Sequence, residues 1–232
     1  MPAANKRLKL LTSNSIRGVL AALGPRFESE SGYTLDASYD PAQVMLRRIA
    51  EGESGDAAIL GVAAIEKLVG DGKIARDSVR RLARCGVGIA VRKGAPRPDV
   101  SSVEALKKTL IETPSLIFTT EGASGMHFSR VIQDLGIAEA IKAKAHRQTG
   151  GLVAEVLARG EVELAVQQIP ELLAVEGVEL VGPLPEPVQA ISTSAAGIFT
   201  DAKNREGAQA LIDFLTSAEA IRVFRETGHE PA

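Results

Sequence analysis

The chain is poor in cysteine, histidine and aromatic residues. Its 232 residues include one Cys, three His and no Trp, and aromatic residues make up 3 %. The single Cys85 cannot form an intramolecular disulfide or a cysteine-based zinc cluster, and His127, His146 and His229 are too widely spread to indicate a histidine metal site. So few rings leave little surface for stacking on sugars or bases. We therefore expect no metal, no cofactor, and no binding of sugars or single-stranded nucleic acid.

Charge of one sign and long apolar runs are also absent. Lys and Arg number 27 against 29 Asp and Glu, a net charge of −2, with no block of like charge. This balance argues against a nucleic-acid or anionic-lipid partner. No apolar run approaches the roughly 18 residues needed to cross a bilayer. The length fits one large domain or two small interlocked lobes, and we expect a monomer.

The N-terminal segment bears on the compartment. Its basic start is followed only by Leu8, Leu10 and Leu11, which Lys9 interrupts, so it does not form the apolar region of a secretory signal. The sequence as written predicts a cytoplasmic protein. A processed periplasmic chain carrying an added Met would look the same, so a periplasmic location is the alternative.

Short β-branched runs alternate with stretches of helical period, which predicts an α/β architecture with mostly parallel sheets. The segment Arg7–Tyr39 is expected to form a β-α-β unit, with Ser15 as the N-cap of its helix. The expected strands are Arg7–Leu11, Tyr33–Tyr39, Ala57–Leu60, Val87–Val91, Leu116–Thr119, Leu164–Gln167, Val178–Val181 and Ala195–Phe199. The other expected helices are Pro41–Glu51, Ala63–Val69, Val103–Ile111, Gly125–Leu135, Leu152–Ala158, Ile169–Ala174, Asn204–Leu215 and Ala218–Glu226.

Two segments rich in Pro and Gly indicate where the chain changes lobe. They are Lys93-Gly-Ala-Pro-Arg-Pro and Gly182-Pro-Leu-Pro-Glu-Pro. Because they lie far apart in the sequence, they predict a middle lobe inserted into an outer one. We expect an outer lobe of residues 1–88 and 193–232, an inserted lobe of residues 89–192, and a ligand cleft between them.

The first candidate binding motif is Thr12-Ser-Asn-Ser-Ile, between a strand end and a helix start. Free N–H groups and the helix dipole at such a position suit an anion, so Ser13, Asn14 and Ser15 are candidate ligand contacts. Arg17 in the first turn opposes the dipole, and a bound anion would compensate it. In the alternative reading Ser15 only caps the helix and Arg17 is solvated.

The second motif, Thr119-Thr-Glu-Gly-Ala-Ser-Gly-Met-His-Phe, runs from a strand through a Gly-rich turn into a helix. Glycine lets the backbone approach a ligand closely, so Ser124 and Gly125 are candidate anion contacts. The lysine and spacing of a nucleotide-binding P-loop are missing. His127 is either a neutral donor facing the cleft or an ordinary surface residue.

Two further motifs carry polar residues. In His146-Arg-Gln-Thr-Gly-Gly-Leu, ahead of a helix, Gly151 is a candidate contact, and Arg147 is either a ligand cation or a solvated loop residue. Gln167 and Gln168 end an apolar strand, where an amide can read a ligand oxygen. Strand alternation sends one of the two toward the core or the solvent.

In order along the chain, these segments resemble the molybdate-binding-protein-like branch of the type II periplasmic-binding-protein superfamily. The segments that carry the resemblance are Ser13-Asn-Ser-Ile-Arg-Gly-Val-Leu, Phe27-Glu-Ser-Glu-Ser-Gly-Tyr, Arg47-Arg-Ile-Ala-Glu-Gly-Glu-Ser-Gly-Asp-Ala-Ala-Ile-Leu, Gly122-Ala-Ser-Gly, Glu161-Val-Glu-Leu-Ala-Val-Gln-Gln, Gly177-Val-Glu-Leu-Val-Gly-Pro-Leu-Pro and Ala210-Leu-Ile-Asp-Phe-Leu-Thr-Ser-Ala-Glu-Ala. The resemblance implies two lobes joined by two crossovers, an anion held by helix N-termini, and an ABC-transporter permease as partner if the protein is exported.

The sequence departs from the molybdate binders of this branch at two places. Their second serine-rich turn is replaced by Tyr39-Asp-Pro-Ala-Gln, and the tyrosine that they tend to carry at the end of the later strand is replaced by Gln167-Gln168. With Arg17, Arg47 and Arg147 present, the sequence favours a planar organic carboxylate over a tetrahedral oxyanion, because guanidinium forks match carboxylates.

The leading functional hypothesis is a binding protein for a di- or tricarboxylate. The alternative is an enzyme, because some members of this branch are similar to aconitate isomerase, which moves a proton along an allylic tricarboxylate. Such a reaction needs a base, for which His127, Glu121 and Glu171 are the candidates. A third hypothesis is an effector domain without its DNA-binding helices. The sequence does not favour it, because no basic helix-turn-helix precedes residue 6.

Overall fold

The computed structural model describes residues 6–232, and the chain forms two compact units. The first unit comprises Ser192–Ala232 and the described part of Met1–Arg84, and the second is Cys85–Ile191. Both segments rich in Pro and Gly therefore lie inside the second unit. The strand that precedes the first of them pairs with its neighbours over its whole length, from Val87 to Arg92, and this pairing keeps it in the second unit.

The first unit is built on one sheet, with strand order β11-β4-β10-β3-β1-β2. Strand β1 pairs in parallel with β2 and β3, whereas β10 runs antiparallel to β3. The elements are β1 (Arg7–Thr12), η1 (Asn14–Ile16), α1 (Arg17–Ser31), β2 (Thr34–Tyr39), α2 (Ala42–Ala50), β3 (Ala57–Gly61), α3 (Val62–Gly70), η2 (Arg76–Ser78), β4 (Arg80–Cys85), β10 (Ser192–Ile198), α9 (Arg205–Leu215), α10 (Ala218–Glu226) and β11 (Glu230–Pro231).

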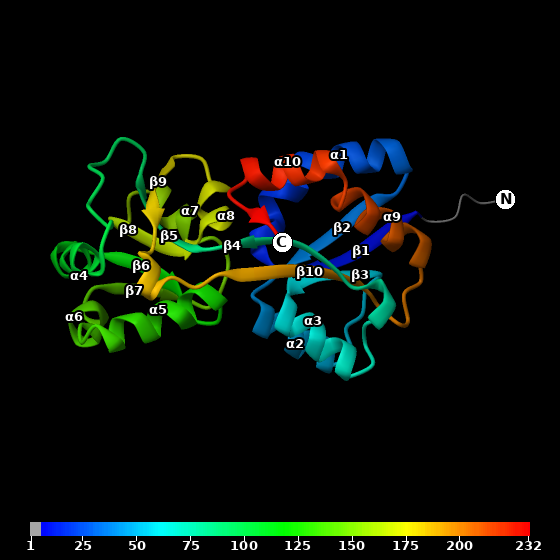
Figure 1. Cartoon of the computed structure of the whole chain (residues 1–232), viewed down its shortest axis with the longest axis horizontal. Coiled ribbons are helices and arrows are strands. Elements are labelled where there is room, and N and C mark those ends of the chain that lie inside the picture. Colours follow the sequence, from blue (N-terminus) through cyan, green and yellow to red (C-terminus); the bar gives the residue numbers. More distant parts are fainter. Residues whose placement is uncertain (1–5) are drawn as a thin grey trace. The chain divides into compact units, whose positions relative to one another are not determined.

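Helices cover both faces of this sheet, with α1 and α10 along one face and α2 and α3 along the other (Figure 1). Side chains alternate along β1, so Leu8 and Leu10 enter the core under α1, α9 and α10, while Leu11 enters the core under α2 and α3. A strand buried on both faces reads as a nearly continuous apolar run. This is why the central strands were predictable from the sequence.

The second unit has a five-stranded sheet of order β7-β6-β8-β5-β9. Strand β6 is parallel to β7 and β8, and β5 is antiparallel to β8 and β9. The elements are β5 (Val87–Arg92), α4 (Val103–Glu112), β6 (Leu116–Thr119), α5 (Ala123–Asp134), α6 (Ala138–Lys142), β7 (Ala145–Gln148), α7 (Val153–Ala158), β8 (Leu164–Gln168), α8 (Ile169–Leu173), β9 (Val178–Pro183) and η3 (Glu186–Val188).

The α/β class and the β-α-β unit at the N-terminus are confirmed, and both sheets are mixed. Parallel pairing joins β1 to β2 and β3 in one sheet and β6 to β7 and β8 in the other, whereas β10–β3, β5–β8 and β5–β9 are antiparallel. The sequence did not predict β4, β7, β11 and α6. Strand β4 carries three exposed arginines, and β7 is an exposed edge strand with the sequence Ala-His-Arg-Gln, so neither has an apolar alternation to detect.

No helix within residues 6–232 is long and apolar enough to cross a membrane. The N-terminal segment used for the compartment prediction begins in residues 1–5, which lie outside the described residues.

His229 is a buried neutral histidine that ties the C-terminal segment to α10. Its side chain is 4 % exposed and packs edge-on against Phe224, with 5.1 Å between the ring centroids. Its Nδ1 lies 3.3 Å from the hydroxyl of Thr227, and its Nε2 has no partner among the described residues. Burial lowers the pKa of His229 from 6.5 to about 4, because desolvation disfavours the charged ring, and a hydrogen bond to the backbone of Phe224 acts against that fall.

We expect His229 to make the protein acid-labile. The unfolded chain takes up the proton at a higher pH than the folded chain. The contribution of the neutral His229 ring to the free energy of unfolding is therefore complete above pH 6.5 and is lost as the pH falls toward 4. At pH 5 the expected loss is about 2 kcal/mol of unfolding free energy. Urea titrations of the parent, His229→Leu and the exposed-histidine control His146→Leu at pH 7.5 and 5 measure it. An identical pH slope in the parent and His229→Leu would contradict this account.

Candidate functional site

The first part of the candidate site is the turn between β1 and α1. The strand ends at Thr12, and the backbone N–H of Ser13 donates to the carbonyl of Ile59 on β3 at 3.0 Å. Asn14 and Ser15 are buried in the short 3-10 turn η1. The hydroxyls of Ser13 and Ser15 lie 3.0 Å apart and bond to each other.

The prediction that Ser15 caps the helix is wrong. Ser15 lies inside η1, and neither η1 nor α1 has a side-chain cap. The reason is that its hydroxyl is engaged with Ser13 instead of a backbone N–H. The first N–H groups of a helix have no intrahelical partner. The turn therefore keeps the uncapped, positively polarised end that suits an anion.

Arg17 is held over this turn by two contacts. Its Cζ lies 4.1 Å from the centroid of the Tyr39 ring, and its Nη2 donates to Asn14 Oδ1 at 3.3 Å. Its Nε is buried and has no hydrogen-bond partner among residues 6–232. Within the same residues Arg17 forms no ion pair with a carboxylate. The first unit thus presents an oriented guanidinium with an unused donor and no counter-charge.

Tyr39 was not predicted to take part in the site. It ends β2 directly opposite Thr12 of β1 in the parallel register, so the two strand ends share one edge of the sheet. Burial raises the pKa of Tyr39, and the Arg17 charge acts against that rise. The sequence signal was its position at a strand end beside the β1–α1 turn, but an aromatic residue there is equally compatible with a core position.

The second part of the candidate site is the β6–α5 turn of the second unit. Phe118 and Phe128 pack edge to face, with 5.1 Å between ring centroids, and hold α5 on β6. A Cβ at Gly125 would lie 1.6 Å from the Thr119 carbonyl oxygen, so packing alone requires glycine there. Ser124 is buried, α5 has no side-chain cap, and the buried Thr119 hydroxyl has no partner within residues 6–232. Ligand contacts of Ser124 and Gly125 stay predictions.

His127, in the first turns of α5, is half-buried, and its Nε2 lies 2.8 Å from the carbonyl oxygen of Val188. A carbonyl only accepts, so Nε2 carries the hydrogen, and in the neutral ring Nδ1 holds the lone pair. A role of His127 as a base through Nδ1 stays a prediction.

The two glutamines differ in what their amides do. Gln167 is 1 % exposed, its Oε1 accepts from Val153 N at 3.0 Å, and its Nε2 donates to Gly151 O at 2.8 Å. Gln167 therefore positions the start of α7, where Gly151 has a φ of +84°. Gln168 precedes α8, and its side chain does not cap that helix. Which of the two amides contacts a ligand stays a prediction.

The remaining candidates are spread over both units. Arg147 is exposed on β7, with its Cζ 5.5 Å from the Phe118 ring centroid. Arg47 is exposed on α2, and Glu121 and the buried Glu171 belong to the second unit; all three have interaction partners. Ser13, Asn14, Ser15 and Arg17 belong to the first unit, and Ser124, Gly125, His127, Gly151, Gln167 and Gln168 belong to the second. That one ligand contacts both groups stays a prediction.

Comparison with known structures supports the fold. The periplasmic molybdate-binding protein of Azotobacter vinelandii superposes with a TM-score of 0.82 at 15 % identity, covering 97 % of this chain and 99 % of that one. The sulfate-binding protein SubI of Mycobacterium tuberculosis gives a TM-score of 0.75 at 17 % identity, covering 97 % and 87 %. These matches confirm the type II periplasmic-binding-protein fold that the sequence predicted.

Comparison of sequences identifies the family. An aconitate isomerase from Pseudomonas sp. is 32 % identical over 230 residues, which cover 97 % of this chain and 87 % of that protein. The model of the bacterial extracellular solute-binding protein family matches residues 8–230. The chain therefore belongs to the bacterial extracellular solute-binding protein family.

Proposed function

We propose that the protein binds a small organic polycarboxylate, with Arg17 as the main charged contact. The observation that carries this proposal is the guanidinium of Arg17, which rests on Tyr39, has a buried unpaired Nε, and has no carboxylate partner among residues 6–232. A buried donor without an acceptor is costly. A ligand carboxylate would supply both the missing acceptor and the missing negative charge.

The donor chemistry favours a carboxylate over a tetrahedral oxyanion. A guanidinium is planar and donates along two parallel directions, which matches the two oxygens of a carboxylate. One of the Ser13 and Ser15 hydroxyls donates to the other at 3.0 Å, which leaves a single hydroxyl hydrogen of this pair for a tetrahedral oxyanion. The 32 % identity to an aconitate isomerase over almost the whole chain points to tricarboxylates as the first ligands to test.

A thermal-shift screen followed by calorimetry tests this proposal. The probes are cis- and trans-aconitate, citrate, isocitrate and malate, against molybdate, tungstate, sulfate and phosphate. A ligand that binds only the folded protein raises its melting temperature. At a concentration of a hundred times the Kd, such a ligand adds about 2.7 kcal/mol to the free energy of unfolding. We expect shifts with the tricarboxylates. Shifts confined to molybdate, tungstate or sulfate would overturn the carboxylate assignment.

A second candidate function is isomerisation of aconitate, and His127 is the observation that favours it. Its Nε2–H is held by the Val188 carbonyl, which leaves Nδ1 as a base. In this reaction the base takes a proton from the methylene carbon, and the C–H electron pair spreads over the allylic system and its carboxylates. The proton then returns to the carbon at the other end as the double bond moves. A cation such as Arg17 would stabilise the charge that develops.

Membership of an extracellular solute-binding family supports a location outside the cytoplasmic membrane. As a binding protein there, the chain would deliver its ligand to an ABC-transporter permease. As an isomerase it needs no such partner.

A further inference from the structure

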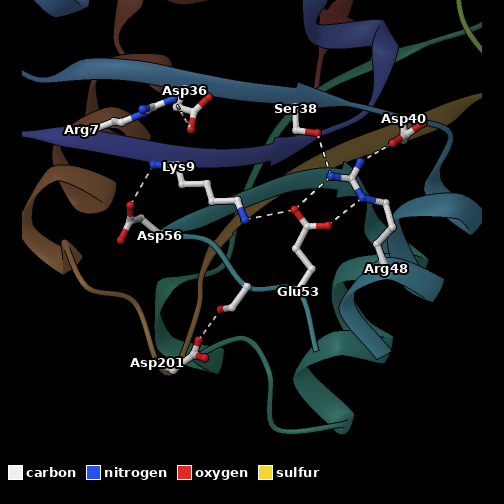
Figure 2. Close-up of polar contacts among 10 residues, drawn as sticks. Arg7, Lys9, Asp36, Ser38, Asp40, Arg48, Glu53, Asp56 and Asp201 are labelled. Carbon is white, nitrogen blue, oxygen red and sulfur yellow. Dashed lines mark hydrogen bonds and ion pairs between the residues drawn. The ribbon is translucent and has the colours of Figure 1, made fainter. Parts of the chain in front are cut away.

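A cluster of charged and polar side chains lies on the first unit's sheet, on the face opposite Tyr39. We call it the Arg48 cluster; it consists of Lys9 of β1, Ser38 of β2, Asp40 after β2, Arg48 of α2, and Glu53 of the α2–β3 loop. Figure 2 shows Arg48 pointing toward Ser38, Asp40 and Glu53, with Glu53 between Arg48 and Lys9. Two cations and two carboxylates balance, so the cluster itself does not attract an anion.

Arg48 holds both neighbours of Tyr39. Its Nη2 donates to Ser38 Oγ at 3.0 Å, and its Nη1 forms an ion pair with Asp40. Side chains alternate along a strand, so Ser38 and Asp40 point to the α2 side while Tyr39 packs on the α1 side. The backbone N–H of Asp40 also donates to the carbonyl of Thr12 at 3.1 Å. The backbone of Tyr39 is thus held on both sides.

Glu53 holds the side chain of Arg48 in place. Its carboxylate receives Arg48 Nε at 2.7 Å and Lys9 Nζ at 3.0 Å. These two cations lower the pKa of Glu53 to about 2, so Glu53 stays ionised at neutral and mildly acidic pH. All the nitrogens of the Arg48 guanidinium are engaged with acceptors fixed on different elements. A lysine at this position, with a single nitrogen, cannot hold the same set.

We propose that Arg48 is a positioning residue of the anion site: by holding Ser38 and Asp40 it fixes Tyr39, whose ring orients the guanidinium of Arg17. The expected effect of Arg48 on ligand affinity rests on the proposed function. A donor that is already oriented loses less conformational entropy when the ligand arrives. When the stack loosens, Arg17 gains alternative rotamers, and ligand affinity falls although no contact to the ligand has been removed.

The test compares Arg48→Lys and Arg48→Met with the control Arg26→Met. Arg26 also joins two carboxylates of the first unit, Glu30 and Glu219, whereas the cation on the Tyr39 ring is Arg17. Calorimetry with trans-aconitate measures affinity. In the ligand-free protein, NMR measures the upfield shift that the Tyr39 ring imposes on the Arg17 side-chain protons, assigned with Tyr39→Leu. If Arg48→Met does not fold, Asp40→Asn replaces it as the test variant, because it removes the ion pair between Arg48 and Asp40 and keeps the contact with Ser38.

We expect the Arg48 variants to bind trans-aconitate about tenfold more weakly and to lose the upfield shift, while Arg26→Met changes neither. Unchanged affinity with an unchanged shift would overturn the proposal. Weaker binding with an unchanged shift would overturn it too, because the loss of affinity would then not come from a change in the Arg17–Tyr39 contact. If Arg17→Ala itself binds normally, the proposed function fails, whereas the ligand-free NMR measurement still decides whether Arg48 sets the Arg17–Tyr39 geometry.

Discussion

Replacing Arg17 with alanine is expected to weaken tricarboxylate binding by about 1.5–3 kcal/mol, which is roughly 10- to 150-fold in Kd. The loss comes from the charge-assisted hydrogen bonds of a guanidinium that is already oriented by Tyr39 and Asn14. The melting temperature without ligand should hardly change, because Arg17 has no ion pair within the described residues and its buried Nε is unpaired. Isothermal titration calorimetry and thermal unfolding of the same samples measure the two quantities.

Two variants sharpen this experiment. Arg17→Lys keeps the charge and loses the planar fork, so it should recover only part of the affinity. Arg97→Ala is the matched control, because Arg97 is an exposed arginine of the second unit paired with Glu179 at 3.2 Å. It should bind like the parent. Unchanged affinity in Arg17→Ala would remove Arg17 from the site, and with it the central observation behind the proposed function.

Replacing His127 with glutamine is expected to separate binding from catalysis. The glutamine amide can donate to the Val188 carbonyl as Nε2 of His127 does, but it has no basic nitrogen to replace Nδ1. If the protein is an isomerase, turnover should fall by about 10²–10⁴-fold, the usual contribution of a general base, while trans-aconitate still binds. Proton NMR of aconitate in D₂O follows both the isomerisation and the exchange of the methylene protons.

The control for this experiment is His146→Gln, which changes an exposed histidine on β7. It should leave turnover unchanged. Turnover retained in His127→Gln would exclude His127 as the base and turn attention to Glu121 and Glu171. A parent protein that binds aconitate without converting it would favour the solute-binding function and remove the isomerase alternative.

The sequence and the structure agree most closely where burial dictates residue type. Strand β6 was predicted with its observed bounds, because Leu116, Ile117 and Phe118 face helices on both sides of the sheet and leave a continuous apolar run. Edge strands have no such requirement. Strand β7, with exposed His146 and Arg147, is defined by backbone pairing with β6, which side-chain patterns do not record.

Within the candidate site, the sequence located the turns but not the roles of their side chains. Ser13 to Arg17 and Ser124 to His127 do lie where strands end and helices begin. Ser15 pairs with a neighbouring hydroxyl instead of capping the helix. Both amide atoms of Gln167 form hydrogen bonds with the backbone at the start of α7. A hydrogen-bonding group has several possible partners nearby in sequence and many more in space, so its actual partner could not be predicted from spacing.

The sequence by itself determined the α/β class and the strand–turn–helix positions, because these depend on hydrophobic periodicity and on the placement of turn residues. Only the tertiary structure decided which polar groups remain available. Arg17 meets Tyr39 because β1 and β2 pair in register, and Arg48 reaches Ser38 and Asp40 because α2 packs back on that sheet. Hydrogen bonds and ring contacts act over a few ångströms in space, and the fold alone sets which residues come that close.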